Sequence, residues 1–164
     1  MRILFSILAI SWLFSSCSKD SSSGKIEIYA VTARNFTVVP CKVDPDSTVI
    51  TSTPLFDDGD IVSYNSTTYD FTLSSNAAQL FNAQTPRSVF ALTLNKKVIY
   101  YFVHMPIFIS SSCDQSITAN VLTTTNKMTV RLGWGTLPSM QALIKDERNN
   151  AELLAALSAQ GKLQ

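Results

Sequence analysis

Residues 88–103 read SVFALTLNKKVIYYFV, two runs rich in β-branched and aromatic residues on either side of the polar turn Asn95-Lys96-Lys97. Residues of these types favour half-buried pleated strands, and a short polar interruption between two such runs favours a β-hairpin. We therefore expect one strand over Ser88–Leu94 and a second over Val98–Val103, paired antiparallel. This hairpin is the clearest element in the chain.

Further β-rich runs lie on both sides of the hairpin. Lys25–Val31 alternates apolar and polar residues with the period of two that a half-buried strand requires. Pro40 cannot donate to a ladder, so a strand around it is expected at an edge or bulged. Besides Lys25–Val31, the candidate runs from which the strands are drawn are Thr37–Val43, Val49–Thr53, Ile61–Tyr64, Thr68–Leu73, Ile107–Ile109, Ser116–Leu122 and Lys127–Leu132.

Helical signals occur in the middle of the chain and at its end. Ser74-Ser75-Asn76 can cap a helix over Ala77–Gln84, and β-branched residues almost vanish between Pro138 and Leu163. Strands and helices do not alternate, which argues against a doubly wound or barrel fold. We expect a single α+β domain over residues 25–164, with a mainly antiparallel sheet of about five to seven strands, one middle helix and C-terminal helices.

The composition of the 164 residues excludes two broad classes. Hydrophobic residues make up 46% and charged residues 15%, which is unlike a disordered chain. The formal net charge is +1, so nucleic acid is not an expected partner.

The first residues have the organisation of an export signal. One positive charge at Arg2 precedes the apolar run Ile3–Phe14, which is too short to cross a hydrocarbon core of about 30 Å as a helix. Phe14-Ser15-Ser16-Cys17 then places a cysteine behind two small residues at the end of this run.

This arrangement resembles the lipobox and type II signal peptide of bacterial lipoproteins, and Ser16-Cys17 is typical of those of Bacteroidota. The resemblance implies that residues 1–16 are removed as a signal peptide and that Cys17 receives diacylglycerol and a further acyl chain such as palmitate. Residues 17–24 would then form a polar linker to a membrane of the cell envelope. Ser18 after the cysteine resembles the class of lipoproteins that is sorted to the outer membrane. The resemblance implies a protein anchored there, facing either the periplasm or the cell surface. The alternative is an ordinary secretory signal with Cys17 as a structural cysteine.

A second resemblance concerns the domain itself. Asp60–Tyr64, Phe71–Leu73 and the two runs of the hairpin resemble a pattern in uncharacterised small envelope lipoproteins. No activity is implied by this resemblance.

The remaining cysteines, Cys41 and Cys113, form an even pair outside the cytoplasm, and we expect a disulfide between them. The alternative is two separate buried thiols.

The sequence offers few groups for catalysis or metal binding. His104 precedes a loop with Ser110–Ser112 and Asp114, which could supply a hydrolase, but no Gly-x-Ser-x-Gly elbow is present. The alternative is an imidazole at the surface or at a strand end. Asp57, Asp58 and Asp60 form a weak calcium candidate, for which an ordinary solvated turn is the alternative. No zinc spacing occurs, and no cofactor is expected.

Four aromatic residues are candidates for a binding face: Tyr64, Tyr100, Tyr101 and Trp134. Cross-strand packing is the alternative role. We therefore expect a non-enzymatic, membrane-tethered binding or accessory module with a protein or glycan partner. The alternatives are a small envelope hydrolase using His104 and the Ser110–Asp114 loop, and a structural protein of the cell surface.

Overall fold

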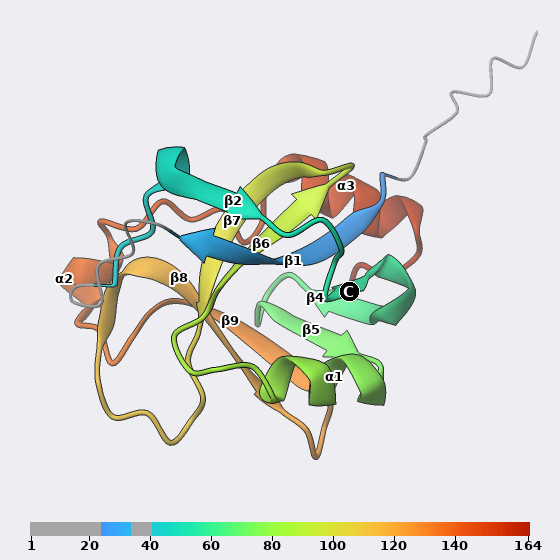
Figure 1. The fold of residues 1–164 in the computed structure, drawn as a ribbon. Coiled ribbons are helices and arrows are strands. Elements are labelled where there is room, and N and C mark those ends of the chain that lie inside the picture. The colour runs from blue at the N-terminus through green and yellow to red at the C-terminus, as the bar shows by residue number, and fades with distance from the viewer. Residues whose placement is uncertain (1–23, 34–40) are drawn as a thin grey trace, which may run out of the picture.

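The computed structural model describes residues 24–33 and 41–164. The expected signal peptide, Cys17 and the linker up to residue 23 lie outside the described residues, as do residues 37–40 of one expected strand. The described part is mostly sheet with three α-helices (Figure 1). The strands are β1 Ile26–Ala33, β2 Thr48–Ile50, β3 Phe56–Asp57, β4 Ile61–Asn65, β5 Asp70–Leu73, β6 Val89–Leu94, β7 Lys97–His104, β8 Cys113–Leu122 and β9 Lys127–Trp134.

The strands form one open sheet in the order β2-β1-β6-β7-β8-β9-β5-β4, and β3 also pairs with β1. Every pair is antiparallel except β7–β8, which is parallel, so the sheet is mixed. The α+β class is confirmed, but the expected five to seven strands become nine among the described residues. The number of strands is higher because even segments as short as β2 and β3 form hydrogen-bonded pairs with β1.

The hairpin at residues 88–103 forms as expected, while the expected strand at Ile107–Ile109 is wrong. β6 and β7 pair along their whole overlap, from Val89 opposite Val103 to Leu94 opposite Lys97. Beyond β7, Pro106 accepts a hydrogen bond from the Ile109 amide, which closes a turn instead of a strand. Ile107 and Phe108 are consequently exposed to solvent.

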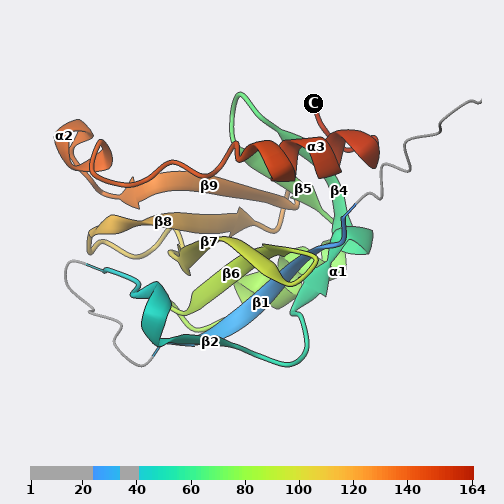
Figure 2. The same ribbon diagram turned by 90° about the horizontal axis from the view of Figure 1, so that it is seen from above.

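Three helices accompany the sheet: α1 Ser75–Asn82, α2 Pro138–Gln141 and α3 Ala151–Ala159. The Ser74 hydroxyl caps α1 as expected by accepting the Ala77 amide hydrogen bond. Phe81 of α1 and Leu153 of α3 are fully buried in the main hydrophobic core. Helices α2 and α3 lie toward opposite ends of the molecule (Figure 2).

The expected disulfide between Cys41 and Cys113 is confirmed. The two Cα atoms lie 4.9 Å apart across a sequence separation of 72 residues, and both side chains are fully buried. They pack against Val103 and Met105 in a second, smaller core. The Ser116 hydroxyl donates a hydrogen bond of 2.7 Å to the Cys41 carbonyl. The bridge thus holds the segment that leads into β2 against the beginning of β8.

Replacing both cysteines, as Cys41→Ala with Cys113→Ala, should lower the free energy of unfolding by about 2–4 kcal/mol, because the unfolded chain loses a long closed loop. Urea denaturation followed by circular dichroism measures the change. As a control, the unchanged protein under dithiothreitol should lose a similar amount. Equal stability of the oxidised protein and the double variant would show that the bridge adds nothing.

Candidate functional site

The candidate site begins where β7 and β8 separate. These strands pair only over Phe102–His104 and Ile117–Ala119. The β6–β7 register shifts between Leu92 and Thr93, and the β8–β9 register shifts between Cys113 and Ile117. Extra residues of this kind bend a strand and can end its pairing. The two irregularities therefore account for the separation of β7 from β8 before Phe102.

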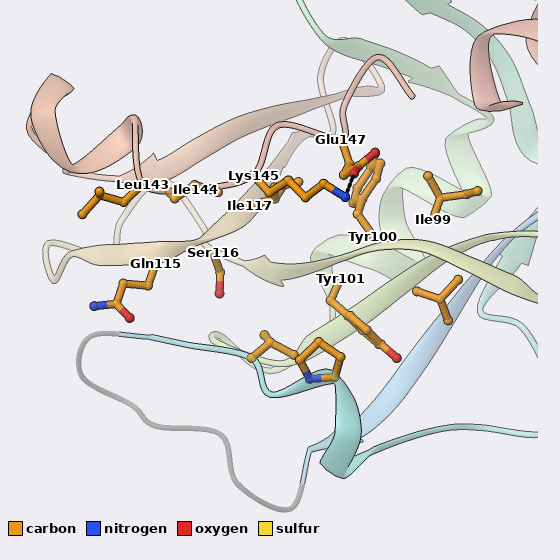
Figure 3. Close-up of a pocket in the computed structure, with 13 residues that line it drawn as sticks. Ile99, Tyr100, Tyr101, Gln115, Ser116, Ile117, Leu143, Ile144, Lys145 and Glu147 are labelled. Carbon is orange, nitrogen blue, oxygen red and sulfur yellow. Dashed lines mark ion pairs between the residues drawn. The ribbon is translucent and has the colours of Figure 1, made fainter. Parts of the chain in front are cut away.

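A cleft of about 480 Å³ occupies this separation (Figure 3). Successive side chains of a strand point to opposite faces of a sheet. The cleft is nevertheless lined by the neighbours Tyr100 and Tyr101 of β7 and by the consecutive Gln115–Ile117 of β8. Because side chains that point to both faces of the sheet line this cleft, it lies beside the edges of the two strands, in the plane of the sheet.

Two loop segments wall the cleft. Leu143 and Ile144, which follow α2, form one wall (Figure 3). Val43 and Pro45, from the segment that leads into β2, line the cleft as well. All four are apolar. The ion pair between Lys145 and Glu147 stands beside the first wall.

Tyr100 is one of the two tyrosines of β7 that line this cleft. Its side chain is only 5% exposed, and no other described residue makes a hydrogen bond to its hydroxyl. Burial raises the pKa of Tyr100 well above its ordinary value, so the group stays protonated and able to donate. Tyr101 is half-buried, and its hydroxyl lies 2.7 Å from the Thr48 hydroxyl, which donates to it.

The four aromatic candidates do not form one face. Tyr100 and Tyr101 meet at the cleft, whereas Trp134 lies in a separate hollow of about 330 Å³ beside Arg131. Tyr64 has no exposed surface and packs against Phe71 at 4.3 Å between ring centroids. The inclusion of Tyr64 in an exposed binding face is therefore corrected, because its side chain is part of the core.

Sequence reasoning missed both walls of the cleft and the polar residue Gln115. Leu143 and Val43 belong to irregular segments, which carry no periodic pattern to indicate their position. The one available signal was the stretch Cys113–Ile117, whose residues do not alternate apolar and polar as a regular half-buried strand does. This broken alternation coincides with the register shift of β8.

His104 is an interior residue rather than a surface group. Its side chain is fully buried, and its ring lies 4.6 Å from the Phe81 ring between centroids. Neither ring nitrogen makes a well-formed hydrogen bond among the described residues. Burial lowers the pKa of His104 below its ordinary value, and backbone groups of Thr85 and Gln84 offset this only in part.

The groups of the hydrolase alternative do not converge. The Ser111 hydroxyl accepts a hydrogen bond from Arg87, and the Ser112 hydroxyl donates to Asp114. The second oxygen of Asp114 accepts from Thr136. Since His104 bonds to none of these side chains, the structure shows no nucleophile beside a base at this loop.

His104 should make stability depend on pH. In the unfolded chain its imidazole binds a proton as the pH falls through about 6.5, while the folded protein keeps it neutral to lower pH. The free energy of unfolding should therefore fall below pH 6.5, by at most about 1.4 kcal/mol per pH unit, until the folded-state pKa is reached.

Urea denaturation between about pH 7.5 and about pH 5 measures this dependence, in the window where histidine titrates. His104→Phe should flatten the curve, and the difference between the two proteins isolates the imidazole from carboxylates that titrate at lower pH. Parallel curves for both proteins would contradict the assignment.

The three aspartates of the calcium candidate have separate partners. Asp57 pairs with Lys25 at 3.0 Å, which holds the pKa of that carboxyl below its usual value. Asp58 accepts a hydrogen bond from Gln160, and Asp60 accepts one of 2.6 Å from Ser74. Across residues 24–33 and 41–164, no group of three or more His, Cys, Asp or Glu side chains is placed to hold a metal ion.

Fold and cleft together define the class: an open, mixed-sheet α+β domain with a ligand-sized cleft between two strands. Comparison with known proteins finds no matching family model, no significantly similar curated protein and no significantly similar solved structure. In the described part of the chain, every helix is too short or too polar to span a membrane.

Proposed function

We propose that this protein is a non-enzymatic binding module of the bacterial cell envelope, tethered to a membrane, and to the outer membrane in particular, by lipid on Cys17. The observation that carries the binding role is the cleft between β7 and β8, where apolar walls combine with the polar residues Tyr100, Tyr101 and Gln115. Clefts of this size that combine apolar walls with a few polar groups are the usual form of ligand sites.

The place where the domain begins supports a tethered arrangement. The Gly24 carbonyl accepts a hydrogen bond of 3.0 Å from Gln160, immediately after α3. Helix α2, which precedes the Leu143 wall, lies toward the other end of the molecule (Figure 2). A chain attached through residue 24 therefore leaves the Leu143 side of the cleft accessible to a partner.

The chemistry of the cleft supports binding rather than catalysis. A nucleophile or general base has to lose or accept a proton near neutral pH. Tyr100 is shifted in the opposite direction, because burial raises its pKa. A neutral hydroxyl that keeps its proton can donate a hydrogen bond to a bound group throughout the physiological range.

Lipid attachment is tested by growing expressing cells with radiolabelled palmitate. The protein should incorporate label, and Cys17→Ala should abolish incorporation because the variant has no thiol to modify. The Cys41→Ala, Cys113→Ala double variant is the matched control and should keep the label. Label retained by Cys17→Ala, or an intact mass without acyl chains, would contradict the tether.

Use of the cleft is tested with the photocrosslinking residue p-benzoylphenylalanine in the full-length, membrane-tethered protein. Placed at position 143, which is 73% exposed on the cleft wall, it should give a discrete adduct on irradiation of intact cells. Position 137 is the matched control, because Leu137 is 69% exposed and does not line the cleft. Equal adducts from both positions, or none, would count against a binding function of this cleft.

A further inference from the structure

We propose that the occupant of the cleft is an extended peptide segment of a partner protein, which adds to the free edge of β7 as an extra strand. This inference rests on the binding function proposed above and specifies its ligand. It follows from the backbone of β7 and from the shape and lining of the cleft.

No described strand pairs with the outer edge of β7 before Phe102. On one side β7 pairs with β6 back to Lys97, but on the other side β8 pairs only with Phe102–His104. Among the described residues, no loop backbone or side chain makes a hydrogen bond to the backbone of Lys97–Tyr101. An unpaired strand edge of this kind is a template for the main chain of another segment.

The cleft has the shape that such a strand requires. An added strand lies in the plane of the sheet, and its side chains point alternately to the two faces. The cleft lies in that plane, with Leu143 and Ile144 along one side (Figure 3) and with Val43 and Pro45 also in its lining. At about 3.3 Å per residue, a segment of about four to five residues matches the Lys97–Tyr101 edge.

The lining of the cleft favours a peptide over a sugar. Along the β7 edge that no described strand pairs, main-chain donors and acceptors have the spacing of another extended main chain. A sugar that stacks on protein needs an open aromatic face, but Tyr100 is only 5% exposed and Tyr101 is half-buried, with its hydroxyl bonded to Thr48. Because apolar residues line the cleft on both faces, the segment should present apolar surface to both sides, as the methyl groups of Val and Thr do.

Strand addition is tested on the full chain, purified from membranes in detergent, by fluorescence anisotropy of a labelled peptide. The probe is Lys-Val-Thr-Val-Thr-Val-Lys carrying fluorescein. Its control is the same peptide with alternate amides N-methylated, which keeps the side chains but removes main-chain donors. The N-methylated peptide should bind about tenfold more weakly or worse, because hydrogen bonds to the β7 edge are lost.

A second comparison locates the binding. Leu143→Asp should weaken binding of the probe by about tenfold, because it places a charge on an apolar wall, while Leu137→Asp should leave it unchanged within about twofold. Both positions are exposed, so circular dichroism should show an intact fold for each variant. Strand addition would be overturned if the folded, disulfide-bonded protein bound both peptides with equal affinity. It would also be overturned if the two substitutions had equal effects on binding.

The outcomes separate this inference from the binding function itself. If the probe fails to bind while position 143 still gives its specific adduct in cells, the cleft has a different occupant and only the peptide inference is lost. If the probe binds but no adduct forms at position 143, the purified protein accepts an added strand at the β7 edge. The proposal that the cleft binds a partner in cells is then overturned.

Discussion

The parallel pairing of Phe102–His104 with Ile117–Ala119 joins two antiparallel half-sheets. On one side of this short junction lie β2, β1, β6 and β7, and on the other lie β8, β9, β5 and β4. A parallel pair cannot be made by a tight hairpin, so the chain between β7 and β8 has to turn back along the molecule. Because only three residue pairs connect the halves, the strands can separate on the side that precedes Phe102.

Side chains support this junction from both faces. On one face Phe81 contacts the rings of Phe102 and His104, at 6.0 and 4.6 Å between centroids. On the other face Val103 packs with the disulfide between Cys41 and Cys113. The two cores thus meet at the three residues of β7 that connect the half-sheets. The buried imidazole of His104 is tolerated there because it remains neutral.

The predictable features of this protein are local ones. The hairpin at residues 88–103, the Ser74 cap and the pairing of Cys41 with Cys113 each follow from residue types or from a count, and the structure contains all three. The parallel β7–β8 pair and the strand β3 depend on which distant segments meet, which local propensity does not encode. Tyr100 and Tyr101 could be named as binding candidates from their residue type, whereas the cleft itself and a wall residue such as Leu143 depend on contacts between distant segments.

The disulfide also makes the cleft dependent on where the chain folds. Cys41 stands two residues before Val43, so the bridge to Cys113 fixes the position of one cleft wall. In a reducing cytosol the two sulfurs remain thiols, and nothing covalent holds that wall against β8. If the chain is exported as proposed, this wall of the cleft would be fixed only after the bridge has formed in an oxidising compartment, so the finished cleft would be a product of export rather than of synthesis.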